Sequence, residues 1–229
     1  MSFSKEWDER YNANTNLSIW PWSDVVSYVM RYARPNTADC RVLELGCGAG
    51  ANIPFFQNLG VQYYSIEGSI SIVERLWERF PALKDRIVAG DFTADIPFPE
   101  QFDLIVDRSS LTHNTTSAIH GCLELVYQKL KPNGKFIGID WFSTLHPDSK
   151  NGVPDEDIYT RRDYTHGQFA HVGRVHFSDK AHLLELFSKF EITIMEHKII
   201  QREIPEAGLT LAVWNFVAVK PNPLRINIK

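Results

Sequence analysis

The segment Glu44-Leu45-Gly46-Cys47-Gly48-Ala49-Gly50 places glycine at every second position after a short apolar run. A glycine loop between a strand and a helix lets backbone amides and the helix N-terminus approach a ligand without obstruction by side chains. The sequence therefore predicts a cofactor-binding loop. The pattern Gly46-x-Gly48-x-x-Ala51 also fits a dinucleotide loop, with Glu67 placed to hold a ribose hydroxyl, so the glycines alone leave two cofactor classes open.

Four acidic residues, Glu44, Glu67, Asp91 and Asp107, close or follow successive apolar runs. The carboxyl ends of parallel strands meet at one edge of a sheet, where open α/β proteins bind ligands. Carboxylates at that edge would attract a ligand that carries sulfonium and ammonium cations, and Glu67 can accept hydrogen bonds from two ribose hydroxyls. The alternative is structural: strand-end acids that accept bonds from nearby backbone amides, with Asp91 as a turn cap.

The elements that position these residues alternate along the chain. Hydrophobic periodicity and breaker residues predict strands at about 41–45, 61–66, 86–89, 102–106 and 135–140 and helices at about 22–34, 52–59, 69–80 and 116–130. Parallel neighbours need a crossover, and a helix supplies it, so the alternation predicts a parallel sheet. A helix at 178–190 precedes strands at 192–200 and 209–219, whose short connection predicts a terminal antiparallel hairpin.

Residues 40 to 140 resemble the class I S-adenosylmethionine-dependent methyltransferases. The loop 44–50 is similar to the family's first motif, and Glu67 matches the acid that binds the ribose hydroxyls. Gly90-Asp91-Phe92 resembles the third motif, beside the adenine, and Asp107-Arg108-Ser109-Ser110 the fourth, beside the methionine portion. Lys131-Pro132-Asn133-Gly134-Lys135 resembles the turn into strand five.

The resemblance implies S-adenosyl-L-methionine as the cofactor. It implies that an N-terminal cap and the strand-end loops hold it, through Trp7, Tyr11, Glu44, Gly46, Cys47, Gly48, Gly50, Asn52, Glu67, Gly68, Ser69, Gly90, Asp91, Phe92, Asp107, Arg108 and Ser109. For Trp7 and Tyr11 the alternative is a structural contact with the outer helices.

The expected fold is an α/β, Rossmann-like, seven-stranded and mostly parallel sheet with helices on both faces and an antiparallel C-terminal hairpin. We expect one methyltransferase domain over residues 1–229, with an N-terminal cap at 1–34 and an insertion or lid at 143–177.

The acceptor side of the site is less sharply defined. His113, just after strand four, is a candidate general base for a hydroxyl acceptor, or a histidine that bonds a helix start. Asp140 is a second catalytic candidate, and the neighbouring Trp141 contacts either the acceptor or the lid. Arg161 and Arg174 in the insertion could bind an anionic group of the acceptor, or could be solvated surface residues.

We expect no metal, because the five-residue spacing of His166, His171 and His176 puts them on one face of neither a helix nor a strand. The net charge of −4 provides no general attraction for nucleic acid or an anionic membrane. The N-terminus lacks the apolar run of a signal peptide, and three cysteines at unpaired spacings favour a reducing, cytoplasmic location.

These observations favour methylation of a small molecule, with O-methylation preferred over N-methylation. The family's nucleic-acid amino-methylases carry an Asn/Asp-Pro-Pro-aromatic motif after strand four, which Asp107-Arg108-Ser109-Ser110 lacks. A protein acceptor, a nicotinamide-dependent oxidoreductase and a non-catalytic cofactor-binding scaffold are the alternatives. The oligomeric state is not predicted.

Overall fold

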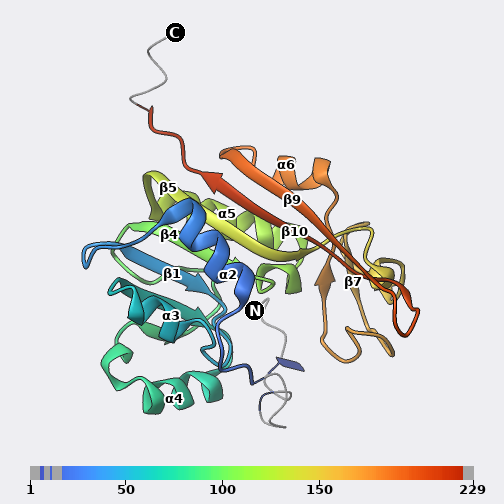
Figure 1. The fold of residues 1–229 in the computed structure, drawn as a ribbon, viewed down its shortest axis with the longest axis horizontal. Coiled ribbons are helices and arrows are strands. Elements are labelled where there is room, and N and C mark those ends of the chain that lie inside the picture. The colour runs from blue at the N-terminus through green and yellow to red at the C-terminus, as the bar shows by residue number, and fades with distance from the viewer. Residues whose placement is uncertain (1–5, 8–10, 12–16, 224–229) are drawn as a thin grey trace.

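A twisted seven-stranded sheet forms the centre of the computed structural model, which describes residues 6–7, 11 and 17–223 (Figure 1). The strand order is β3-β2-β1-β4-β5-β10-β9. The strands are β1 (Arg41–Leu45), β2 (Gln62–Glu67), β3 (Ile87–Ala89), β4 (Phe102–Arg108), β5 (Leu130–Phe142), β9 (Glu191–Arg202) and β10 (Gly208–Val219). Strands β1 to β5 pair in parallel, and β10 is antiparallel to both β5 and β9.

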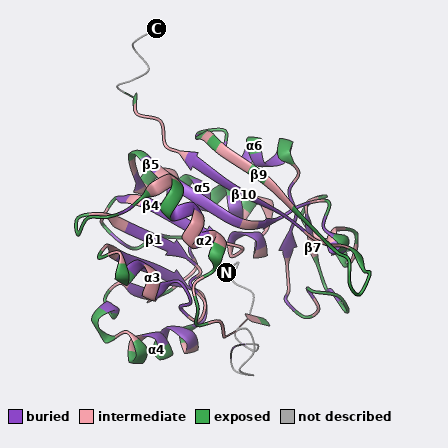
Figure 2. Cartoon of the chain, viewed as in Figure 1, coloured by how far each residue is buried: buried purple, intermediate pink, exposed green. Residues whose placement is uncertain are grey.

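Helices cover both faces of this sheet. They are α2 (Ser23–Tyr28), continued by the π-helical turn η1 (Val29–Ala33), α3 (Ile53–Asn58), α4 (Ile70–Arg79), α5 (Thr116–Lys129) and α6 (Lys180–Leu186). Side chains of β1 alternate between the two layers: Leu43 and Leu45 join the core beneath α5 and α6, and Val42 joins the core beneath α2, α3 and α4. The central strands of the sheet are therefore buried on both sides, as Figure 2 shows, whereas the edge strand β9 has no buried residue. The predicted Rossmann-like fold, with its antiparallel terminal hairpin, is confirmed.

The insertion between β5 and α6 contains a small antiparallel sheet that the sequence did not predict. Its strands are β6 (Val153–Pro154), β7 (Thr160–Arg162) and β8 (Val175–His176). A separate apolar cluster supports it, built from Phe142, Tyr164, Phe169, Val172, Val175, Phe177 and Val213. Val213 belongs to β10, so the insertion packs against the extended end of the β9–β10 hairpin (Figure 1).

In the predicted N-terminal cap, residues 1–5, 8–10 and 12–16 lie outside the described residues, whereas Glu6, Trp7, Tyr11 and the stretch from Leu17 onward are described. Within the described part of the chain, no helix is long and apolar enough to span a membrane.

Candidate functional site

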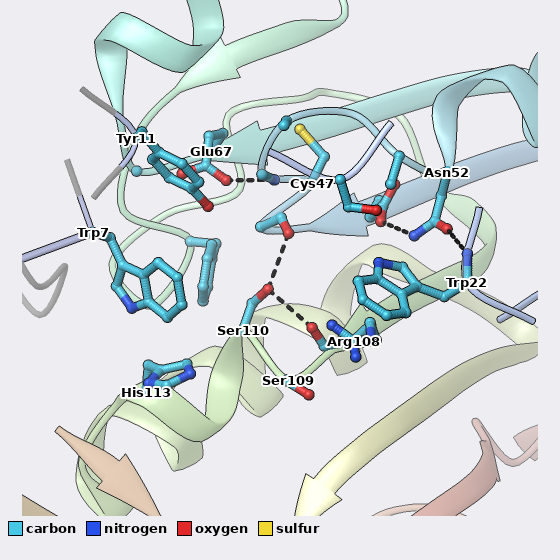
Figure 3. Close-up of a pocket in the computed structure, with 18 of the residues that line it drawn as sticks. Trp7, Tyr11, Trp22, Cys47, Asn52, Glu67, Arg108, Ser109, Ser110 and His113 are labelled. Carbon is cyan, nitrogen blue, oxygen red and sulfur yellow. Dashed lines mark hydrogen bonds between the residues drawn. The ribbon is translucent and has the colours of Figure 1, made fainter. Parts of the chain in front are cut away.

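A cavity of about 460 Å³ lies at the carboxyl ends of β1, β2 and β4 (Figure 3). Its volume is in the range of small-molecule and cofactor sites. Its walls come from the loops after these strands and after β3, and from the N-terminal segment. The lining residues are Trp7, Tyr11, Leu17, Ser18, Trp22, Glu44, Gly46, Cys47, Gly48, Ala49, Ala51, Asn52, Glu67, Gly68, Gly90, Asp91, Phe92, Arg108, Ser109, Ser110, His113 and Asn114.

The glycine loop takes a backbone path that side chains would obstruct. Gly46 has φ +66°, and a Cβ atom there would lie 2.3 Å from Ser110 Oγ. Gly50 has φ +78°, and its Cβ atom would lie 2.6 Å from Leu76 Cδ2 on α4. Gly46 thus allows the β1 and β4 loops to meet beside the cavity. Gly50 does not line the cavity and instead allows close packing against α4.

Glu67 holds the glycine loop and the start of α4 together. Its Oε2 accepts a bond from the Gly48 amide at 2.8 Å, and its Oε1 accepts one from the Ser69 amide at 3.0 Å. Ser69 does not line the cavity; its Oγ caps α4 by accepting a bond from the Ile72 amide at 3.3 Å. Each carboxylate oxygen can accept a further bond from a ligand hydroxyl. Tyr11, whose hydroxyl pKa is raised by burial and then by Glu67, closes this end of the cavity.

Glu44 lies at the other end of the loop and is almost completely buried. Its two oxygens accept bonds from Asn52 Nδ2 at 2.7 Å and from the Tyr63 hydroxyl at 2.5 Å. Burial raises the pKa of this carboxyl, while the two donors act in the opposite direction. Asn52 also accepts a bond from the Trp22 amide at 3.1 Å, so it connects Glu44 to the N-terminal segment.

Asp91 fits both interpretations that the sequence left open, a turn cap and a residue of the cofactor site. Its Oδ1 accepts bonds from the Thr93 amide at 3.0 Å and from Thr93 Oγ1 at 2.6 Å, which is a turn cap. The residue also lines the cavity, together with Gly90 and Phe92. A structural bond and a position at the site therefore coexist.

Asp107 lies behind the cavity wall and does not line it. Its carboxylate accepts bonds from the amides of Ser110 and Leu111, at 3.1 and 3.0 Å, and from Trp141 Nε1 at 2.6 Å. Burial raises the pKa of Asp107 to about 7, against the effect of these donors. The residue therefore shapes the turn that carries Arg108 and Ser109 to the cavity.

Trp141 is fully buried in the core beneath α6, so its position does not agree with the predicted contact with the acceptor. The physical reason lies in the preceding residue. Asp140 has φ +55°, a left-handed conformation that interrupts the alternation of side chains along β5. Ile137 and Ile139 share one core, whereas Trp141 turns into the other.

Asp140 itself lies behind Arg108 and does not line the cavity. Its Oδ2 accepts bonds from Arg108 Nε at 3.0 Å and Nη2 at 2.9 Å. This placement does not bring its carboxylate to an acceptor, in contrast to the predicted catalytic role. The Arg108 Cζ atom also lies 3.5 Å from the centre of the Trp22 ring.

His113 lines the cavity between the N-terminal segment and the insertion. Its Nδ1 lies 2.9 Å from the carbonyl oxygen of Arg174, an atom that can only accept a bond. Nδ1 therefore carries a proton, and in the neutral form of the ring the lone pair lies at Nε2. Trp7 contacts the ring edge-on, with the ring centres 4.9 Å apart.

The two arginines predicted to bind the acceptor do not line the cavity. Arg174 contributes its carbonyl group to His113, while its side chain pairs with Asp155 at 2.6 Å. Arg161 is half-buried in β7. No group of three or more metal-ligating side chains occurs in the described part of the chain, and His176 is bonded to Thr160 and Ser178.

Sequence reasoning missed seven lining residues: Leu17, Ser18, Trp22, Ala49, Ala51, Ser110 and Asn114. Ala49 and Ser110 lie inside the motifs quoted above and Ala51 directly follows the first of them, so assigning every residue of each motif, and the next residue, to the site would have included all three. The N-terminal residues have no motif, although the aromatic Trp22 before a helix was a visible signal.

Part of the chain matches a known family. Residues 43–138 match the family model described as a methyltransferase domain. No curated protein matches the sequence. Among solved structures, the chain is similar to a SAM-dependent methyltransferase from Methanosarcina mazei, with 18% identity and a TM-score of 0.66 over 88% of this chain and 99% of that one.

Two further structures have the same fold. One is a S-adenosylmethionine-dependent methyltransferase from Clostridium acetobutylicum, with 14% identity and a TM-score of 0.60 over 94% of this chain and 96% of that one. The other is the glycopeptide N-methyltransferase MtfA complexed with sinefungin, with 20% identity and a TM-score of 0.56 over 86% of this chain and 87% of that one.

Proposed function

We propose that the chain is a class I, S-adenosylmethionine-dependent methyltransferase, and that it methylates a small molecule at a hydroxyl group in preference to an amine. We further propose that the cavity residues hold the cofactor, with the ribose at Glu67, the adenine at Asp91 and Phe92, and the amino-acid end at Glu44.

The residues present fit this cofactor. Glu67 offers carboxylate oxygens to hydroxyl donors, and Glu44 offers negative charge to an ammonium group. The cofactor, when bound, supplies an activated methyl group on a sulfonium. The chain has to exclude water and align the acceptor with that methyl group. The cavity and its aromatic N-terminal wall provide such an enclosure.

The observation that carries the choice of a hydroxyl acceptor is the tautomer of His113. A hydroxyl must lose its proton during transfer, and a neutral imidazole that lines the cavity can take it at Nε2. The bond of Nδ1–H to the Arg174 carbonyl fixes the required tautomer. We propose His113 as the general base.

A small-molecule acceptor agrees with the size of the cavity and with the net charge of −4, which gives nucleic acid no general attraction. All three cysteines are free thiols, which supports a reducing cytoplasmic location.

Calorimetry and turnover test the proposal. S-Adenosylmethionine and S-adenosylhomocysteine should bind with micromolar affinity, whereas NADH should not. Methyl transfer from labelled cofactor should be measured across panels of hydroxyl and amine metabolites, with RNA and peptides alongside. Transfer confined to amines would overturn the O-methylation proposal, transfer to RNA or peptides alone the small-molecule proposal, and cofactor binding with no transfer would indicate a scaffold.

A further inference from the structure

The two ends of the cavity differ in charge. Glu67 lies towards one end, and Asn52, Trp22 and Arg108 lie at the other (Figure 3). Glu44 belongs to this second end, because it accepts a bond from Asn52. Burial raises the pKa of the Glu44 carboxyl, and Arg108 is near enough to act in the opposite direction through its charge. Opposite charges thus face one end of the cavity, which is the arrangement that a zwitterionic α-amino acid group requires.

Arg108 is the one arginine or lysine side chain among the described residues that line the cavity. A carboxylate that leaves water for this partly enclosed space requires donors or a cation. Glu44 matches the ammonium of the cofactor's amino-acid end. The carboxylate of that end has its complementary charge at Arg108.

The guanidinium is held in a fixed orientation. Asp140 engages the edge formed by Nε and Nη2, and the Trp22 ring covers one face at 3.5 Å. A guanidinium has five N–H donors in a rigid plane, so the edge formed by Nη1 and Nη2 still offers donors to a second carboxylate.

The backbone around Arg108 is strained. Ser109 has φ +58° and Asp140 has φ +55°, both in the left-handed region that non-glycine residues rarely occupy. Ser109 Oγ donates a bond to the Asp140 carbonyl at 2.9 Å, which joins the two strained strand ends. Strain of this kind persists where the surrounding structure enforces it, and it concentrates at ligand sites.

The same group is tied to the N-terminal segment. The Asp140 amide donates a bond to Asn215 Oδ1 at 2.8 Å, and Asn215 Nδ2 donates one to Asp24 Oδ2 at 3.1 Å. Asp24 also pairs with Lys198 at 2.6 Å. Asp24 lies two residues after Trp22, so one network anchors both partners of Arg108.

We propose that Arg108 binds the carboxylate of the cofactor's amino-acid end, and that Trp22 and Asp140 are positioning residues that orient its guanidinium. This inference rests on the use of S-adenosylmethionine by the enzyme. It gives Asp140 a role in cofactor selection instead of the catalytic role first expected of it.

The test compares S-adenosylmethionine with decarboxylated S-adenosylmethionine, which keeps the sulfonium and the amine. Calorimetry on the wild-type protein should show a preference for the carboxylated compound of about 10-fold to 100-fold, the scale of a charge-assisted hydrogen bond. Arg108→Gln should bring this ratio close to one while leaving the affinity for the decarboxylated compound almost unchanged. Arg108→Lys should restore part of the ratio.

Trp22→Ala and Asp140→Asn should each reduce the ratio several-fold. Trp20→Ala is the matched control, because Trp20 is exposed and does not line the cavity, and this variant should keep the wild-type ratio. An unchanged ratio in Arg108→Gln, or an equal loss of affinity for both compounds in Arg108→Gln and Arg108→Lys, would overturn the proposal. Failure of the wild-type protein to bind either compound would instead overturn the cofactor assignment itself.

Discussion

Replacement of Glu67 by glutamine is the sharpest test of how the cofactor is held. Each carboxylate oxygen already accepts a bond from a backbone amide, Gly48 at 2.8 Å and Ser69 at 3.0 Å. The glutamine NH₂ group would replace one acceptor oxygen, so that two hydrogen-bond donors would face each other at one of these contacts. It would also remove the charge that strengthens the proposed bonds to the ribose.

Loss of one bond to a charged group costs about 1.5–3 kcal/mol, which corresponds to a roughly 10-fold to 150-fold weaker affinity. Calorimetry with S-adenosylhomocysteine and its 2′-deoxy analogue measures this effect. Glu67→Gln should bind the first compound more weakly by that factor and should discriminate less between the two. Glu74→Gln, an exposed carboxylate on α4, is the control and should match the wild type. A folded Glu67→Gln protein with wild-type affinity would refute our account of the ribose site.

Three further predictions concern the loop, the base and the buried acid. Gly46→Ala should lower the unfolding temperature more than Gly60→Ala. Both glycines have positive φ, but a Cβ atom at Gly46 would lie against Ser110, whereas a Cβ atom at Gly60 would have nothing within 4 Å. Equal losses would contradict the argument that Gly46 is needed for close approach. His113→Gln should lower kcat on a hydroxyl acceptor by about 100-fold to 10,000-fold with unchanged cofactor affinity, and an unaltered kcat would remove it as the base. Burial raises the pKa of Asp107 from 3.8 to about 7, so the stability associated with its protonated form is present below pH 4 and is lost as pH rises to 7. In urea unfolding, the free energy of unfolding of Asp107→Asn should therefore rise relative to that of the wild type as pH increases from 4 to 7. A difference that stays constant over this range would disprove the pKa shift.

The sheet was predictable because its strands carry a strong local signal. Residues 41–45 form β1 as predicted, and the predicted helix start at Ser69 is confirmed by its capping bond to Ile72. The sheet of the insertion carried no comparable signal, because β6 and β8 have only two residues each and no periodicity can be read from so few. Its stability comes from contacts distant in sequence, such as Val213 of β10.

The cofactor side of the site was more predictable than the acceptor side for a similar reason. Strand-end motifs fix the positions of Glu44, Glu67 and Asp91, and all three line the cavity. The position of Trp141 depends on the left-handed conformation of Asp140. An aspartate in the sequence does not predict that conformation. The partners of Arg108, which come from β5 and the N-terminal segment, are likewise a product of tertiary structure.

The division between these two sides follows the boundary of the shared domain. Residues 43–138, which match the methyltransferase domain, supply the loops that we assign to the cofactor. Trp7 and Trp22 lie before this stretch, and Arg174, which orients His113, lies after it. Segments outside the shared domain therefore contribute walls to the cavity and contact His113 through Trp7 and Arg174. Acceptor choice should vary with these contacts to His113, so similarity to other methyltransferases identifies the reaction more readily than its substrate.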